Sequence, residues 1–212
     1  MSNIQYLDLL PEVLPHLSGL VSDPLAEVAI KNAVIEFCRD SWIWRHFADV
    51  QDVVAGNAFY DFEPPAGSEV AQVLACVLDG VPLTPLSTDA LNEQLPTWQT
   101  VPGTVKFFTQ LDTASLILAP VPDSNQPHSL LMTLALQPKR AAVAFPQWIA
   151  AQYMEALASG ALTRLMSIPA KPWTDLAGAA MHQNRFQNAL CAAKATGVHG
   201  LGRAILRVRT QH

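Results

Sequence analysis

The sequence predicts an α+β protein in which a helical body, formed by the N- and C-terminal segments, carries an inserted small antiparallel β region. Apolar residues recur at helical spacing near both ends of the chain. Between residues 47 and 138 they recur at intervals closer to two residues, which is typical of strands. That middle region also holds ten of the sixteen prolines and frequent turn signals. Direct packing of the helices on one sheet stays open as an alternative. The expected division is residues 1–46 and 139–199 for the helical body, 47–138 for the β insertion, and 200–212 for a C-terminal arm.

The N-terminal part is expected to hold a short irregular helical segment over residues 4–17 and then a long helix. Two prolines interrupt the first segment. Its shared apolar face would be Leu7, Leu10 and Leu14. The long helix is expected to begin with Asp23 as N-cap and Pro24 at its first position, and to end near Trp44. Its buried face would be Ile30, Ala33, Val34, Phe37 and Cys38.

The middle region predicts six or seven short strands that form a small sheet or barrel. The expected strands are residues 50–54, 59–62, 70–78, 81–83, 105–109, 115–119 and 130–136. Asp79 and Gly80 form a two-residue hairpin signal between the third and fourth of these strands. Residues 88–95 are expected to form one or two helical turns, and residues 120–128 an exposed connection.

The C-terminal part predicts a helical hairpin over residues 145–195. Pro146 is expected to open its first helix, Gly160 to break it, and Pro169 to stop a second turn. Thr174 would cap the long final helix. The apolar stripes expected to face the core are Ile149, Tyr153, Ala156 and Leu157 in the first helix, and Leu176, Ala179, Ala180, Phe186 and Leu190 in the last.

Near the end of the chain, arginine and apolar residues alternate, which predicts a strand or an extended arm. Charge also divides along the chain: residues 1–138 hold four basic and sixteen acidic residues, whereas residues 139–212 hold nine basic and two acidic ones. Such asymmetry can steer one end of a molecule toward an oppositely charged partner, including another copy of itself, although simple solvated charges are an equal alternative. In the arm, Arg203, Ile205, Arg207 and Arg209 fall on one side and Ala204, Leu206 and Val208 on the other.

No catalytic, cofactor-binding or metal-binding motif is present in the sequence. No serine lies in a GxSxG turn, and the histidines lack metal-ligand spacing. His182 is expected to be a solvated residue beside Arg185. The basic arm lacks interleaved aromatic residues, so specific recognition of duplex DNA is not expected. A small hydrolase or lyase acting through β-region carboxylates stays open as an alternative, with Asp49, Asp52, Asp61 and Glu63 as the candidates.

The cysteines and the hydropathy favour a soluble protein of a reducing compartment. Cys38, Cys76 and Cys191 form no CxxC pair and are odd in number, which argues against a disulfide framework. The first residues lack a basic leader region, and no apolar run approaches the length of a membrane span. The tryptophans mostly stand at element boundaries, where core anchoring is favoured over an interface role.

Three stretches, in their order along the chain, resemble head-to-tail adaptor proteins of tailed bacteriophages. These are FCRDSWIWRH at the end of the first long helix, FYDFEPPAGSEV at the beginning of the β insertion, and EALASGALTRLMSIPAKPWTD before the helix that bears Phe186. The adaptors are neck proteins similar to the tail tubular protein A of short-tailed phages. The resemblance covers most of the chain and consists of the order of these stretches and their local amino-acid sequence.

The resemblance implies a structural virion protein, not an enzyme, without a cofactor. It implies a homo-oligomeric ring, commonly of twelve copies, that docks beneath the portal and offers a platform to tail tube, nozzle or fibre proteins. Genomic DNA would pass through the lumen unread. The expected location is the virion neck, and the host bacterial cytoplasm during assembly, with no membrane contact. Another tail or baseplate subunit is a related alternative. The expected interface with portal or neighbour is formed by Arg203, Ile205, Arg207, Arg209 and Trp173.

Overall fold

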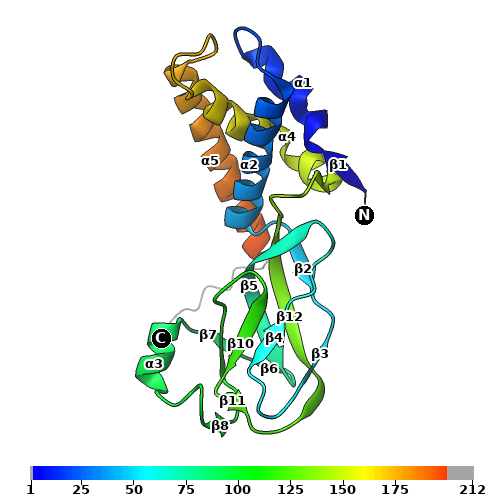
Figure 1. Cartoon of the computed structure of the whole chain (residues 1–212), viewed down its shortest axis with the longest axis vertical. Helices are drawn as coiled ribbons and strands as arrows, with labels where there is room; N and C mark the ends of the chain where they lie inside the picture. The colour runs from blue at the N-terminus through cyan, green and yellow to red at the C-terminus, as the bar shows by residue number, and fades with distance from the viewer. Residues whose placement is uncertain (1, 200–212) are drawn as a thin grey trace, which may run out of the picture.

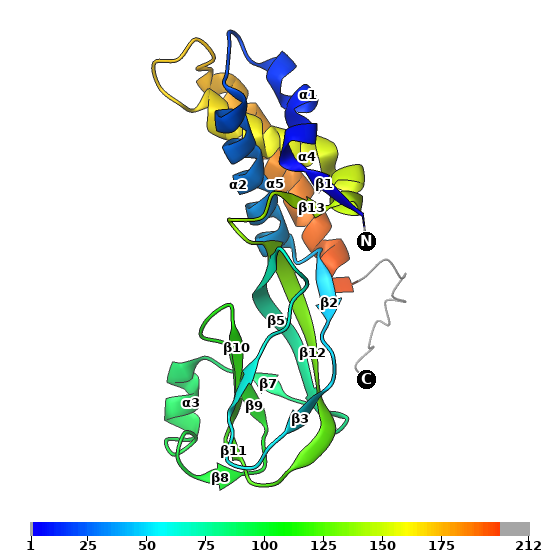
Figure 2. The same cartoon turned by 45° about the vertical axis from the view of Figure 1, so that its right-hand side comes forward.

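The computed structural model describes residues 2–199, which form two bodies stacked end to end along the long axis of the molecule. The long helices gather at one end and most of the strands at the other in both views (Figure 1 and Figure 2). Each body has an apolar core: one cluster draws on residues 6–38 and 145–193, and another on residues 53–136. The predicted arm, residues 200–212, lies outside the described residues.

The helical body consists of three long helices and a series of short N-terminal elements. The long helices are α2 (Asp23–Ser41), α4 (Gln147–Met166) and α5 (Leu176–His199). The N-terminal elements are β1 (Asn3–Gln5), the 3₁₀ turn η1 (Tyr6–Leu9), α1 (Leu10–Val13) and the 3₁₀ turn η2 (Leu14–His16). Strand β1 pairs antiparallel with β13 (Ala144–Pro146), which anchors the start of the chain directly before α4.

Helix α2 buries the face that the sequence predicts, but both of its ends differ from the prediction. The five predicted core residues, Ile30, Ala33, Val34, Phe37 and Cys38, are all buried. The N-cap is Ser22, and Asp23 is the first helical residue. The helix ends at Ser41, before the predicted Trp44, because Trp42 adopts a left-handed conformation with a φ of 55°.

The N-terminal segment buries a different face from the one predicted. Tyr6, Leu9 and Val13 are fully buried, whereas Leu7 is exposed and Leu10 and Leu14 are half-buried. The prediction is wrong because a 3₁₀ turn repeats every three residues, so the buried positions in η1 follow a tighter spacing than in an α-helix. The Tyr6 ring stacks on Phe145 with 5.3 Å between the ring centroids.

Helix α4 runs through Gly160, which the sequence predicts to break it. A Cβ atom at this position would lie 2.8 Å from the Phe186 ring and 2.9 Å from the Cβ of Ala33. Gly160 therefore lets α2, α4 and α5 approach closely, which is a packing role and not a termination signal. Regular helical geometry is lost instead at Tyr153, with a φ of −127° and a ψ of 21°.

The first turn of α5 is capped by Asp175, so the prediction of a Thr174 cap is wrong. Asp175 Oδ1 accepts a hydrogen bond from the Gly178 amide at 3.0 Å. The Thr174 hydroxyl is used in the preceding turn, where it donates to the Ile168 carbonyl at 2.6 Å and accepts from the Lys171 amide at 2.9 Å. Of the predicted stripe, Ala179, Phe186 and Leu190 are buried, whereas Leu176 and Ala180 are exposed.

The strand body contains two facing sheets. One has the order β2-β12-β5-β6, with β3 also paired to β12, and the other has the order β4-β10-β9-β7. The first sheet consists of β2 (Arg45–Phe47), β3 (Gln51–Val53), β5 (Ser68–Leu78), β6 (Val81–Pro82) and β12 (Gln126–Pro138). The second consists of β4 (Phe59–Asp61), β7 (Thr84–Pro85), β9 (Phe107–Thr109) and β10 (Ser115–Ala119). A further pair joins β8 (Pro102–Gly103) to β11 (Val121–Pro122).

The strands are central to the molecule, so the prediction of a small β insertion is wrong in scale. Strands β5 and β12 are 11 and 13 residues long and pair over the whole of β5. Inward-facing residues of both sheets, among them Leu116, Leu118, Leu130 and Leu134, form one core. The hairpin at Asp79 and Gly80 is confirmed, since both have positive φ and connect β5 to β6.

The predicted helical turns in residues 88–95 are confirmed as α3 (Thr88–Gln94). Leu91 of this helix and the nearby Trp98 form a small apolar cluster with Ile117 and Ala119 of β10. Helix α3 and its flanking loops therefore cover the outer side of the four-stranded sheet. The outer side of the β5–β12 pair is described below as a candidate surface.

Candidate interaction surfaces

Strand β5 has an open edge along much of its length. On one side it pairs with β12 from Ser68 to Leu78. On the other side it pairs with β6 at Val77 and Leu78, and the Leu83 amide donates to the Cys76 carbonyl at 2.9 Å. Along this second side, the amide of Val73 donates to the side chain of Gln110 at 2.9 Å. A glutamine side chain thus occupies a hydrogen-bonding position that a neighbouring strand would otherwise use.

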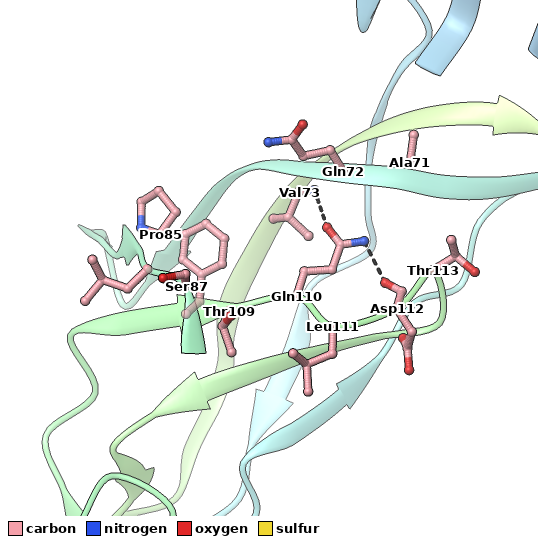
Figure 3. Close-up of a pocket in the computed structure, with 12 residues that line it drawn as sticks. Ala71, Gln72, Val73, Pro85, Ser87, Thr109, Gln110, Leu111, Asp112 and Thr113 are labelled. Carbon is pink, nitrogen blue, oxygen red and sulfur yellow. Dashed lines mark hydrogen bonds between the residues drawn. The ribbon is translucent and has the colours of Figure 1, made fainter. Parts of the chain in front are cut away.

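A groove of about 500 Å³ follows this edge and is lined by residues 71–73, 85–87 and 108–113, which we call the β5 groove. Figure 3 shows Gln110 reaching from the loop after β9 to the backbone of β5, with Val73 on one side and Asp112 on the other. Its Nε2 donates to the Asp112 carbonyl at 2.8 Å. Leu111 has 64% of its surface exposed. The groove therefore combines open backbone with exposed apolar surface.

The β5 groove carries negative charge at Asp112. The Asp112 carboxylate accepts from the amides of Ala114 and Ser115, both at 2.8 Å, and these hydrogen bonds hold its pKa below the usual value. It stays ionised at neutral pH. Residues 47–138 as a whole hold one basic residue, Lys106, and ten acidic ones. A basic segment is the complementary partner for such a surface.

The outer face of the five-stranded sheet is a second candidate surface, because it is apolar and exposed. Phe47 of β2 is 74% exposed and stands opposite Thr133 of β12. Leu131 lies two residues from Thr133 on the same face and stands opposite Val77 of β5. Exposed large apolar side chains on one face of a sheet, here Phe47 and Leu131, make that face a candidate interaction site.

A polar pocket in the helical body is built around His182, which is only 6% exposed. Its Nδ1 lies 3.3 Å from Ser159 Oγ, and its ring centroid is 6.2 Å from that of His16. Burial, and then the charges of Arg185 and His16, lower the pKa of His182. The prediction of a solvated His182 is wrong because α4 and the N-terminal segment cover it.

The predicted interface residues are only partly within the described chain. Arg203, Ile205, Arg207 and Arg209 lie outside the described residues. Trp173 is 9% exposed and belongs to the core cluster of the helical body. Its role at an interface therefore stays a prediction.

The four candidate carboxylates are all exposed, and two of them lie in different sheets, on β3 and β4. Asp52 Oδ1 accepts from the His128 amide at 2.6 Å and lies 3.4 Å from its Nδ1. Its polar partner is thus a histidine at the start of β12. The geometry offers no support to the hydrolase alternative for Asp49, Asp52, Asp61 and Glu63.

The three thiols are free, with Cys38 and Cys76 buried and Cys191 exposed. Burial raises the pKa of both buried thiols to about 12. Within residues 2–199, no group of three or more histidine, cysteine, aspartate or glutamate side chains is arranged to hold a metal ion. None of the helices in this part of the chain is long and apolar enough to cross a membrane.

Sequence reasoning misses the β5 groove and the burial of His182. Gln110 carries no local signal for its role, because its partner, Val73, is distant in sequence. The burial of His182 follows from contacts with α4 and η2, which periodicity within α5 does not reveal. Tertiary contacts therefore define both features.

A family model described as SU10 adaptor protein matches residues 4–208. No curated protein matches the chain.

Proposed function

The chain belongs to the SU10 adaptor protein family and is thus a structural adaptor of a bacteriophage, and we propose that it forms a ring in the neck of the virion. The ring would dock beneath the portal and offer a platform for tail tube, nozzle or fibre proteins. Twelve copies is the number that the sequence resemblance implies. The match of the family model over nearly the whole chain is the observation that carries this proposal.

The distribution of charge supports a ring. A cyclic assembly needs two different, complementary faces on each subunit. The β region, residues 47–138, has a net charge of −9, whereas residues 139–212 have a net charge of +7. Contact between unlike regions of adjacent copies would bring opposite charges together.

The acidic β region also supports passage of DNA without binding. DNA-binding surfaces neutralise phosphates with lysine and arginine side chains. A lumen lined by an acidic surface would repel the phosphate backbone and let the genome slide. We propose accordingly that proximity to DNA is non-specific.

The two-body arrangement supports separate roles for the ends of the molecule. We propose that residues 1–46 and 139–199 act as one rigid helical unit and residues 47–138 as the unit that meets other virion proteins. The arm, residues 200–212, would contact portal or neighbour through Arg203, Arg207 and Arg209.

Incubation of the purified protein with the portal ring of the same phage tests the proposal. We expect a complex whose mass, by mass photometry, exceeds that of the portal by about 276 kDa, which is twelve copies of a 23.0 kDa chain. Electron microscopy should place the added density beneath the portal. A protein that binds only tail or baseplate components, and leaves the portal unchanged, would contradict the proposed position.

A variant without residues 200–212 tests the arm. We expect weaker portal complex formation, and the same for the triple variant Arg203→Gln, Arg207→Gln and Arg209→Gln. The matched control neutralises basic residues of the helical body instead, by Lys139→Gln and Lys171→Gln. Unchanged assembly after truncation would remove the arm from the interface.

A further inference from the structure

We propose that residues 203–209 of one copy dock as an extended strand in the β5 groove of the next copy, so that each subunit of the ring adds a strand to its neighbour. The inference rests on the proposed ring and names the contact that closes it. It follows from the open edge of β5, from the sequence of the arm, and from the place where α5 ends.

The β5 groove has the properties of a strand acceptor. Backbone hydrogen bonding with the β6 segment stops at Cys76, which accepts from the Leu83 amide, and the Val73 amide is satisfied by a side chain and not by a strand. A backbone carbonyl of an incoming strand can replace the Gln110 carboxamide as the acceptor for this amide. Half-buried Leu86 and exposed Leu111 supply apolar surface for the side chains that alternate along such a strand.

The arm has the properties of a strand donor. Residues 203–209 read RAILRVR, with arginines at every second or fourth position and Ala204, Leu206 and Val208 between them. In an extended conformation, one side is apolar and the other is largely cationic. The apolar side matches the lining of the groove, and the cationic side matches Asp112 and the net charge of −9 of the β region.

The place where α5 ends sets donor and acceptor on opposite edges of one sheet. The Lys194 ammonium lies 4.3 Å from the centre of the Trp42 ring, and a Cβ on Gly197 would lie 2.5 Å from the Ser41 carbonyl. The end of α5 thus lies beside the connection to β2, as both views show (Figure 1 and Figure 2). In the sheet order β2-β12-β5-β6, β2 is one edge and the open side of β5 is at the other.

Donor and acceptor on opposite edges generate a head-to-tail contact. Such contacts close into a ring when the rotation between copies permits it, whereas a two-fold dimer would pair like edges. With residues 203–209 in the groove, residues 200–202 form the connection, and the four steps from residue 199 to residue 203 span at most about 14 Å when extended. Four strands also span about 14 Å. Reach therefore allows docking on the same copy as well, and the experiment must distinguish the two.

Mixed disulfide formation between two variants, each with one accessible cysteine, tests the docking. Both carry Cys191→Ser, which removes the exposed thiol, while Cys38 and Cys76 stay buried and protonated. One variant adds Leu111→Cys in the groove and the other adds Leu206→Cys in the arm. They are mixed, assembled on the portal and oxidised. We expect a two-chain disulfide on non-reducing gels, at least tenfold above a matched control pair.

The control pair replaces Leu111→Cys by Leu176→Cys, which is similarly exposed at 69% but begins α5 in the helical body. Equal yields in the two pairs would overturn the proposal. A chain that carries both Leu111→Cys and Leu206→Cys can be diluted among unmodified copies. If its disulfide then forms only within that chain, the arm docks on its own copy and the proposal is overturned. A ring seen by microscopy without the mixed disulfide overturns the docking and leaves the adaptor ring standing. No ring at all overturns both.

Discussion

Gly160 illustrates how the absence of a side chain can position three helices at once. The missing Cβ lets the Phe186 ring and Ala33 approach α4 closely, and Phe186 also lies 6.0 Å from Phe37 between ring centroids. Arg164 extends the same contact zone: it forms an ion pair with Glu36 of α2, and its guanidinium lies 5.9 Å from the centre of the Phe186 ring. The junction of α2, α4 and α5 is thus tightly filled.

Replacing this glycine should destabilise the helical body. Gly160→Ala would place a methyl group within 3 Å of rigid core atoms, and overpacking of this kind costs about 1–3 kcal/mol. The gain in helix propensity of up to about 1 kcal/mol offsets part of this cost. Urea unfolding followed by circular dichroism measures the net loss. Gln152→Ala, on an exposed part of α4, is the control and should change stability little; a more stable Gly160→Ala protein would refute the packing role.

His182 should make stability depend on pH. Its pKa in the folded protein is lowered from the ordinary value of 6.5, so the unfolded chain takes up a proton at higher pH than the folded chain does. The contribution of neutral His182 to the stability of the fold is therefore complete above pH 6.5 and is lost as the pH falls below this value. Ser159, His16 and Arg185 face the ring, with Asp175 as the opposing charge.

Urea midpoints between pH 8 and pH 5 check this dependence. The native protein should lose stability over that range, and His182→Gln should lose less. His128→Gln, at an exposed histidine, is the matched control. Parallel pH profiles for the native protein and His182→Gln would assign the effect to other groups.

Single residues also show what the sequence can and cannot reveal. The buried face of α2 is predicted correctly because helical periodicity depends on local spacing alone. The sequence does not reveal the cap at Asp175, because the adjacent Thr174 is an equally suitable capping residue. It does not reveal the role of Gly160 either, because that role depends on contacts with Ala33 and Phe186, which are distant in sequence. His182 lies in a polar stretch of α5 and is buried by elements far from it in sequence.

At the scale of elements, β5 combines an open edge with local irregularities. Its register with β12 shifts between Thr133 and Leu134 and again between Ala135 and Leu136. Such bulges interrupt the alternation of buried and exposed residues. This is why the sequence predicts shorter strands than the 11 and 13 residues observed in β5 and β12. Each predicted strand overlaps an observed one, but the short strands β2, β7, β8 and β11 are missed, and strand lengths and sheet membership are not predicted.

The Gln110 side chain should stabilise this edge. Gln110→Ala leaves the Val73 amide without its acceptor, at a cost of about 1 kcal/mol or more. Gln110→Glu would not be a clean comparison, because it sets a carboxylate oxygen against the Asp112 carbonyl. Gln94→Ala, at an exposed glutamine of α3, is the control and should change stability little. Thermal unfolding of both alanine variants gives the comparison, and equal stability of the two would mean that the Val73 contact contributes nothing.

At the scale of the whole molecule, the sequence predicts the order of helices, strands and helices correctly, because hydrophobic periodicity changes clearly near residues 47 and 138. It does not reveal that the strands form two facing sheets, since sheet pairing joins residues far apart in the chain. Strands β3 and β4 are neighbours in sequence and yet belong to different sheets. The groove at the sheet edge depends on that topology.

Assembly should weaken as salt rises. In the proposed ring, the charge difference between the β region and residues 139–212 acts between copies, and screening shortens its range from about 10 Å at 0.1 M salt to about 3 Å at 1 M. Portal complex formation, titrated at both concentrations, should lose affinity at least severalfold. The triple variant of Arg203, Arg207 and Arg209 to glutamine should show a smaller salt dependence. Salt-independent binding would point to apolar contacts instead.

The junction between the two bodies bears on how such a protein can diversify. Trp44 is a partly buried side chain that contacts both large cores, while most other members of each cluster belong to one body. Substitutions that reshape the surface of the strand body therefore leave the packing of the helices largely undisturbed. Over evolutionary time, one end can adapt to new binding partners while the other retains its existing attachment.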